Sequence, residues 1–438
     1  MSSYVTRKTL GDTVWFRHDR FGMFIHWGLY AMPARHEWIK HYECIPEEKY
    51  QKYFERFDPD LYDAKEWARQ AKAAGMKYAV FTTKHHEGFC MFDSAYTDYK
   101  CTNTPAGRDL VREYVDAFRA EGLRVGFYYS LIDWHHPDFT IDNIHPRRND
   151  PDALQQNEGR DMRKYAEYMR NQVSELLTNY GKIDILWFDF SYPNNNGTGD
   201  KAWMKGKGKE DWESEKLIAL ARELQPDIII DNRAELEQDL WTPEQFQPTS
   251  WPRHEKTGEL VTWEACQTFS GSWGYHRDEM TWKSPEMLIR MLVNTVALGG
   301  NLLMNVGPTA RGYLDYRAEA ALKVYADWMK YNSRSIYGCT MAEPEFTAPA
   351  DCRYTQSEDG KRLYVHLFAY PFKALELKGL AGKVEYAQFL HDGSELLYTE
   401  ENIDRPFAGD VSDEGRLTIT LPVVKPDVIV PVIELFLK

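Results

Sequence analysis

The chain has 438 residues, which suits one large domain and a smaller one, and its 53 basic and 67 acidic side chains give a net charge of −14. Because an acidic surface repels phosphates, this balance argues against a nucleic-acid-binding protein, and we expect no nucleic-acid partner. The first residues lack the apolar core of a signal peptide, and no apolar run reaches the length of a membrane span. We therefore expect a cytoplasmic protein without membrane contact.

Short runs of β-branched and aromatic residues recur along the first three-quarters of the chain and predict strands. They cover residues 22–27, 77–82, 124–130, 183–188, 227–230 and 301–306, with a weaker run at 260–264. Between them, apolar residues at helical spacing predict helices over residues 110–120, 162–177, 215–224, 285–298 and 317–329. Strand–helix alternation repeated this often predicts a parallel sheet, closed or open.

The sequence favours the closed form of that sheet. Neither a dinucleotide-binding glycine pattern nor a phosphate-binding loop follows any predicted strand, so the open nucleotide-binding sheet loses its usual support. We predict an α/β fold, a (β/α)8-like TIM-type barrel of regular or irregular form, over residues 1–335. Short strands at 363–369, 384–390, 417–421 and 428–436 then predict an antiparallel β-sandwich over residues 336–438.

Polar residues stand at the ends of several predicted strands, which in a barrel is where the functional groups lie. Asp189 closes the run Ile-Leu-Trp-Phe and is either a cap or a site residue; the loop-like residues after it favour a site. Similar positions are held by His26, His85, His86, Tyr129 and Arg233.

Metal chemistry lacks the usual spacing in this chain. The adjacent His85 and His86 point to opposite faces of a strand, and no H-x-H or H-E-x-x-H pattern occurs. The six cysteines are scattered without a C-x-x-C pair and predict free thiols. We therefore expect no metal and no cofactor. Carboxylates, imidazoles and indoles together suit glycosidic cleavage, which needs two carboxylates.

At this point several motifs are recognisable. They are WFRHDRFGMFIHWGLY followed by HEWI, then KYAVFTTKHHEGF, GFYYSLIDWHHPDF, DILWFDF, TPEQF, WEACQTFSGSWGY and GGNLLMNVGPTARG. In this order the chain resembles the glycoside hydrolase family 29 α-L-fucosidases over essentially its whole length. The resemblance implies a carbohydrate-metabolising hydrolase, a retaining exo-glycosidase that releases a terminal α-linked L-fucose from an oligosaccharide or glycoconjugate.

The resemblance also implies roles for individual residues. Asp189 matches the nucleophile, and Glu244 in TPEQF and Glu264 in WEAC compete for the acid/base. We prefer Glu244, because it lies in a loop after the fifth strand that could swing over the leaving group, whereas Glu264, near a strand, is more typical of a fixed structural or binding carboxylate. Hydroxyl-binding residues are expected at His26, Glu37, Trp38, His85, His86, Tyr129 and Arg233, with Trp273 against the apolar face of the sugar.

Three alternatives stay open at the level of sequence. The first is a glycosidase for another sugar of similar hydroxyl pattern, such as a galactoside. The second is a metal-dependent amidohydrolase that uses the histidines and Asp189 on the same barrel. The third is a catalytically inactive carbohydrate-binding protein, against which the presence of both carboxylates argues. Assembly into a homo-oligomer is left open as well.

Overall fold

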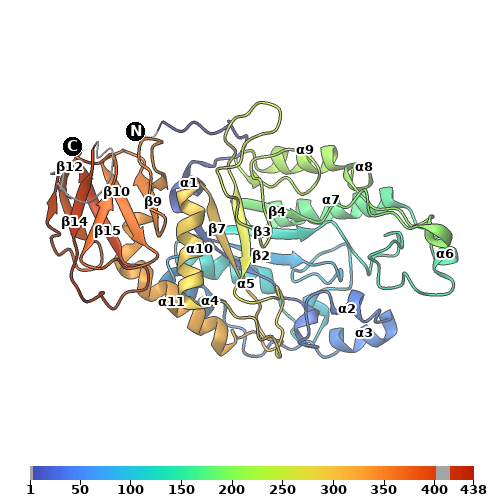
Figure 1. Ribbon diagram of the computed structural model, residues 1–438. Coiled ribbons are helices and arrows are strands. Elements are labelled where there is room, and N and C mark those ends of the chain that lie inside the picture. The colour runs from blue at the N-terminus through green and yellow to red at the C-terminus, as the bar shows by residue number, and fades with distance from the viewer. Residues whose placement is uncertain (1–2, 401–414) are drawn as a thin grey trace.

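The computed structural model describes residues 3–400 and 415–438. Its larger part is a curved parallel sheet whose strands follow the order β5-β4-β3-β2-β1-β7-β6 (Figure 1). The strands are β1 (Phe21–Ile25), β2 (Tyr78–Lys84), β3 (Arg124–Ser130), β4 (Ile185–Asp189), β5 (Ile229–Ile230), β6 (Glu264–Thr268) and β7 (Asn301–Val306). Nearly every strand residue is buried, as expected for a sheet covered on both faces.

A short irregular segment closes the gap between β5 and β6. Parallel bridges join Asp231 to Leu240, Trp241 to Trp263, and Glu244 to Cys266. Residues 240–244 therefore take the place of an eighth strand. Pro243 lies in this segment and has no N–H to donate, which interrupts regular pairing. The barrel is thus (β/α)8-like, as the sequence predicted, and of the two forms left open there it is the irregular one.

Helices surround the barrel and mostly begin at side-chain caps. Asp63, Asp109, Asp161, Ser284 and Asp315 each accept a hydrogen bond from a backbone N–H in the first turn of the following helix. The longer helices are α4 (Ala64–Ala73), α5 (Leu110–Ala120), α7 (Met162–Asn179), α9 (Ser214–Leu224), α10 (Pro285–Ala297) and α11 (Tyr316–Asn332).

Shorter helical segments lie in the connections. They are α1 (Val14–Asp19), α2 (Ile39–Tyr42), α3 (Glu47–Phe54), α6 (Ala153–Gln156) and α8 (Lys209–Trp212), with single 3-10 turns at Leu29–Ala31, Cys101–Asn103, Gly199–Lys201 and Ser333–Ser335. Within residues 3–400 and 415–438, none of the helices combines the length and the apolar character that a membrane crossing requires.

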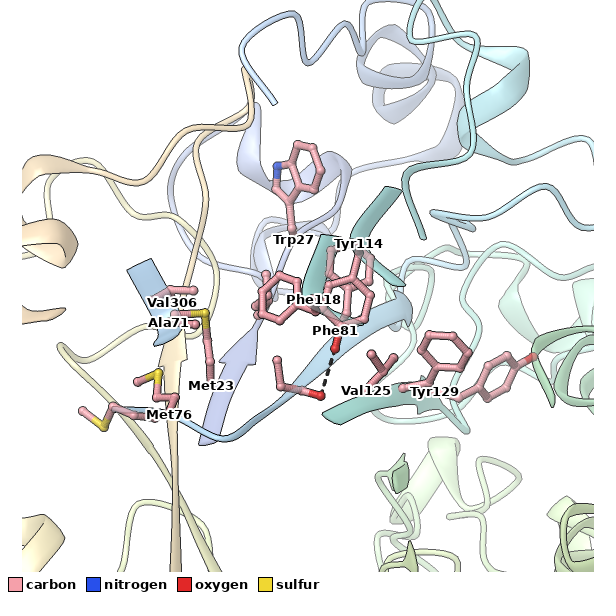
Figure 2. Close-up of a cluster of buried hydrophobic side chains, with 14 of the residues drawn as sticks. Met23, Trp27, Ala71, Met76, Phe81, Tyr114, Phe118, Val125, Tyr129 and Val306 are labelled. Carbon is pink, nitrogen blue, oxygen red and sulfur yellow. Dashed lines mark hydrogen bonds between the residues drawn. The ribbon is translucent and has the colours of Figure 1, made fainter. Parts of the chain in front are cut away.

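Successive strand residues contribute to two different cores because side chains alternate across a strand. One set fills the inside of the barrel, with Phe24, Val80, Tyr128, Ile185 and Trp187. The other set packs between the strands and the helices. Figure 2 shows this outer layer, in which strand residues meet helix residues such as Ala71, Tyr114 and Phe118.

In the C-terminal part, the described residues form two antiparallel sheets that share an apolar core. One sheet has the order β12-β15-β10-β9-β8 and the other β11-β14-β13. The strands are β8 (Cys339–Met341), β9 (Cys352–Ser357), β10 (Arg362–Leu367), β11 (Ala374–Leu377), β12 (Val384–Phe389), β13 (Tyr398–Thr399), β14 (Leu417–Thr420) and β15 (Val432–Leu437). This confirms the predicted β-sandwich.

The sandwich packs against the barrel through α10, which contacts β8 and β9 (Figure 1). The domain boundary at residue 335 stays a prediction; the first sandwich strand begins at Cys339. All six cysteines are free thiols, as predicted.

Candidate active site

A small pocket opens where the carboxyl ends of the barrel strands meet. It brings together every predicted site residue except Tyr129 and Glu264. Its lining consists of Phe24, His26, Glu37, Trp38, His85, His86, Tyr128, Trp187, Asp189, Phe190, Arg233, Glu244, Cys266 and Trp273.

Asp189, the last residue of β4, is held by one donor at each carboxylate oxygen. Tyr128 Oη donates to Oδ2 over 2.8 Å, and Arg233 Nη1 donates to Oδ1 over 2.8 Å. Burial raises the pKa of Asp189 to about 6. The positive charge of Arg233 lowers this pKa, whereas the negative charge of Glu244 raises it further. The carboxylate is therefore fixed in orientation and ionised near neutral pH.

Arg233 joins Asp189 to Glu244. The same Nη1 donates to Glu244 Oε2 over 2.7 Å, so the oxygens of the two carboxylates lie within about 5.5 Å of each other. Glu244 is on the closing segment of the barrel, and 42% of its side chain is exposed. One carboxylate is thus buried and the other faces the entrance. This upper bound is compatible with the roughly 5–5.5 Å typical of retaining glycosidases and falls below the roughly 6.5–9.5 Å of inverting ones.

Both carboxylates precede a residue with strained backbone. Phe190 has φ 80° and Gln245 has φ 51°, values that residues other than glycine adopt at a cost of about 1 kcal/mol or more. In each case the chain turns sharply after the carboxylate, which leaves the side chain at the pocket rather than in a continuing strand.

The floor of the pocket is Trp187, two residues before the nucleophile candidate on the same face of β4. The guanidinium of Arg233 lies 4.4 Å above its ring, and the ring of Tyr128 stacks on it at 5.9 Å and 19°. Both groups that donate to Asp189 therefore rest on one indole.

Two neutral histidines present an unprotonated ring nitrogen to the pocket. Asn305 Nδ2 donates to Trp273, so its Oδ1 accepts from His26 Nδ1 over 2.6 Å. Ser130 Oγ donates to Ile132 and so accepts from His86 Nδ1, also over 2.6 Å. Each ring is left with Nε2 as an acceptor.

Burial keeps these rings uncharged. It lowers the pKa of His26 to about 3 and holds the pKa values of His85 and His86 well below the ordinary range. The 3.8 Å approach of His86 Nε2 to Asp189 Oδ2 is therefore not an ion pair, and a sugar hydroxyl can donate to that nitrogen. His85, whose ring lies 4.0 Å from that of His86, completes the imidazole wall.

Glu37 anchors the opposite wall. Its Oε2 accepts from the backbone N–H groups of Trp273 and Gly274 over 3.1 and 2.9 Å, while burial raises its pKa to about 7. Trp273 lies beside His26, with ring centroids 5.0 Å apart. Trp38 packs edge-on against His86 at 5.0 Å. The loop after β6 is thus pinned to the loop after β1.

The structure corrects the prediction for Tyr129. Its Oη donates to Gln172 Oε1 over 2.7 Å, and its ring lies in the outer core between sheet and helices, labelled in Figure 2. Because neighbouring strand residues point to opposite sides, Tyr128 faces the pocket instead. In β3, Phe127 and Tyr129 point to the outer core and Tyr128 points to the inside of the barrel. This two-residue alternation could have shown from the sequence which tyrosine faces the pocket.

The structure also corrects the position expected of Glu264. The predicted strand at 260–264 lies four residues later, as β6 (Glu264–Thr268), so Glu264 begins the strand instead of ending it. The side chain is fully buried inside the barrel, below Trp187 and outside the pocket. Of the two acid/base candidates, Glu244 alone lies beside Asp189.

Several lining residues were not predicted from the sequence to belong to the site, namely Phe24, Tyr128, Trp187, Phe190 and Cys266. Phe24 and Trp187 share strand parity with His26 and Asp189, so the two-residue period would have found them. Cys266 faces the pocket beneath Arg233, and burial raises the pKa of its thiol. No sequence signal distinguishes it from the other buried cysteines.

Comparison with known proteins places the chain in a family. A family model described as alpha-L-fucosidase matches residues 6–334. The chain belongs to the alpha-L-fucosidase family. Human plasma alpha-L-fucosidase is 29% identical over 393 residues, which cover 82% of this chain and 76% of that protein.

Solved structures agree over the whole length. Alpha-L-fucosidase isoenzyme 1 from Paenibacillus thiaminolyticus is 47% identical, with a TM-score of 0.88 over 97% of this chain and 98% of that one. A family 29 alpha-L-fucosidase from Bacteroides thetaiotaomicron, trapped as a covalent intermediate with 2-fluoro-fucosyl fluoride, is 28% identical, with a TM-score of 0.80 over 99% and 98% of the two chains. The resemblance drawn from the motifs is confirmed, and the chain is a glycoside hydrolase.

Proposed function

We propose that this chain is a retaining exo-α-L-fucosidase, with Asp189 as nucleophile and Glu244 as acid/base. The observation that carries the assignment is the bridge through Arg233, which places the exposed carboxylate within about 5.5 Å of the buried one. The trapped covalent intermediate of the Bacteroides relative supports a mechanism of two displacements.

In the first displacement, an oxygen of Asp189 attacks the anomeric carbon of the bound fucose. As the glycosidic bond breaks, Glu244 gives its proton to the leaving oxygen, and the aglycone departs as an alcohol. Asp189 becomes a neutral ester, and Glu244 becomes a carboxylate. Tyr128 and Arg233 hold the nucleophile in line, so that little reorganisation is needed at the moment of attack.

In the second displacement, the Glu244 carboxylate takes a proton from water, whose oxygen attacks the anomeric carbon. The ester bond to Asp189 breaks, and its electron pair returns to the carboxylate. Two inversions at one carbon give net retention, and both side chains regain their starting protonation. The exposure of Glu244 suits this step, because water and the leaving group use the same side of the pocket.

The lining explains how a single sugar would be held. His26 and His86 offer unprotonated ring nitrogens to hydroxyl donors. The N–H groups of Arg233 all donate to Asp189, Glu244, Thr242 and Cys266, so Arg233 can reach a sugar hydroxyl only by exchanging one of these bonds. Trp273 and Phe24 supply an apolar surface for the C–H face and methyl group of fucose. The pocket ends at Trp187, which suits recognition of a terminal residue.

Hydrolysis of an aryl α-L-fucoside, followed by NMR, tests the proposal. We expect α-L-fucose as the first product, before mutarotation, and no comparable release from aryl galactosides. First release of the β-anomer would contradict a retaining mechanism. Full activity after chelator treatment is expected as well; loss on chelation and recovery with zinc would favour the amidohydrolase alternative. The cytoplasmic location stays a prediction, which fractionation of the source cells would check.

A further inference from the structure

A buried polar column stands beneath the nucleophile, inside the barrel. Glu264 Oε1 accepts from Trp187 Nε1 over 3.3 Å, and Glu264 Oε2 accepts from Tyr78 Oη over 2.5 Å. Asn301 Nδ2 lies 3.4 Å from the same phenol oxygen. All four side chains are almost completely buried. The column runs from the amino ends of β6 and β7 to the floor of the pocket.

The upper end of the column supports both donors to Asp189. Arg233 lies 4.4 Å above the Trp187 ring and Tyr128 stacks on it at 5.9 Å, while each donates to a different oxygen of Asp189 over 2.8 Å. A rotation or shift of this one indole would therefore move both donors at once. The reacting geometry depends on how the indole is fixed.

The hydrogen bond to Glu264, which is long at 3.3 Å, adds a directional constraint to the indole. Packing against Phe24 and Tyr128, at ring-centroid distances of 5.1 and 5.9 Å, restricts the position of the indole, while its rotation about χ2 has the broad energy wells of an aromatic side chain. A hydrogen bond from Nε1 selects a single orientation. Leucine would fill much of the volume of Glu264 without the cost of burying a carboxyl, but it would leave the indole N–H without this acceptor.

We propose that Glu264 is a positioning residue for the fucosidase reaction, which holds Trp187 from below and thereby keeps Tyr128 and Arg233 aligned with Asp189. Glu264 does not touch the sugar and transfers no proton. The inference rests on the proposed function and adds to it a support beneath the site. It also accounts for the WEAC glutamate, which the sequence offered as an acid/base.

Paired substitutions at Glu264 test the acceptor. Glu264→Gln keeps an oxygen for the indole N–H and should retain at least a third of the wild-type kcat/KM for an aryl α-L-fucoside. Glu264→Leu removes the acceptor and should lose about tenfold, the effect of one buried hydrogen bond. Glu434→Leu is the matched control, because Glu434 is a buried glutamate of the sandwich; it should lower stability without changing kcat/KM.

The leaving group separates positioning from proton transfer. Loss of an acid/base spares activated aryl groups and is rescued by azide, whereas misalignment of the nucleophile acts on all substrates. We expect the Glu264→Leu loss to be the same for dinitrophenyl and methyl-substituted phenyl fucosides and to be unaffected by azide. Rescue by azide, with poor leaving groups most affected, would overturn the proposal and make Glu264 a proton donor.

A double-mutant cycle with Trp187→Phe tests whether Glu264 acts on the nucleophile through Trp187. If Glu264 acts through Trp187, Glu264→Leu should cost less than twofold in kcat/KM once the indole N–H is gone. The inference would be overturned if the losses in kcat/KM of the two single variants multiplied in the double variant, or if Glu264→Leu alone kept full activity. Inactivity of the wild-type enzyme on every fucoside would instead overturn the proposed function.

A variant that fails to fold does not end the test. Glu264→Met then replaces Glu264→Leu, since its flexible side chain fills irregular space. The indole N–H resonance of Trp187, assigned as the signal missing from Trp187→Phe, gives a second readout. It should shift between wild type and Glu264→Gln, because the acceptor changes from carboxyl to amide oxygen. An unchanged resonance would contradict the contact.

Discussion

Arg233 donates to Glu244 from the same nitrogen that holds the nucleophile, over 2.7 Å. This hydrogen bond therefore keeps the exposed Glu244 carboxyl group at the pocket mouth, where a loop side chain in water would otherwise sample many rotamers. The aglycone must enter beside this pair. Roles can accordingly be assigned to the two carboxylates by changing each in turn.

Asp189→Gly should reduce turnover of an aryl α-L-fucoside by a factor on the order of 10⁴ or more, because the other carboxylates that line the pocket among the described residues, Glu37 and Glu244, lie on other walls. Added azide should enter the vacated space and restore part of the activity with a single inversion, giving β-fucosyl azide. NMR of the product checks this. Formation of the α-azide would contradict the nucleophile assignment.

Glu244→Ala should affect substrates according to their leaving groups. Dinitrophenyl fucoside needs little protonation and should lose least in the first displacement, whereas alkyl fucosides should be nearly inert. Azide needs no general base, so it should accelerate the second displacement and give α-fucosyl azide with retention. Gln245→Ala, one residue further along the chain, serves as control. Equal losses for all leaving groups would reject Glu244 as the acid.

The pH profile of kcat/KM should fall on the acid side near pH 6, since Asp189 must be ionised to attack and burial raises its pKa to about 6. Tyr128→Phe removes a donor to the ionised form, so the pKa should rise and the acid limb should move to higher pH, by about one unit for one charge-assisted bond. If the acid limb of Tyr128→Phe lies at the same pH as that of the wild type, a group other than Asp189 controls it.

The two adjacent tyrosines should give opposite results. Tyr129→Phe breaks only the bond to Gln172 in the outer core, so we expect a loss of about 1 kcal/mol in unfolding free energy with KM and the pH profile unchanged. Tyr128→Phe should alter catalysis. Urea unfolding and kinetics on both variants check the corrected assignment, which a raised KM in Tyr129→Phe would contradict.

Repeated strand–helix patterns predicted the barrel well, because strands buried on both faces and amphipathic helices leave strong periodic signals. The segment 240–244 escaped prediction, since Pro243 and non-local bridges, not local pattern, make it part of the barrel. Its neighbour β6 was placed four residues early for the same reason, and Glu264 with it. The strand ends of β1, β2 and β4 were predicted closely, and with them His26, His85 and Asp189.

The parts of the site missed from sequence depend on side-chain direction. Tyr128 and Tyr129 are chemically identical, and only strand parity decides which one faces the pocket. The link between Trp187 and Glu264 joins residues 77 positions apart, so only the folded barrel reveals it. Family motifs located the chemistry without giving the direction of each side chain.

Stability should depend on pH through Glu264. Burial raises its pKa from 4.5 to about 7, so the folded state holds this proton more tightly than the unfolded chain. The stabilising contribution is present below about pH 4.5 and is lost as the pH rises through 7. Glu264→Gln does not titrate there, so its unfolding free energy relative to wild type should increase by roughly 3 kcal/mol between pH 4 and pH 8. Urea unfolding of both proteins across this range measures the difference. Parallel curves would mean that Glu264 ionises normally in the folded barrel, and its bond with Tyr78 would then have to hold a buried charge.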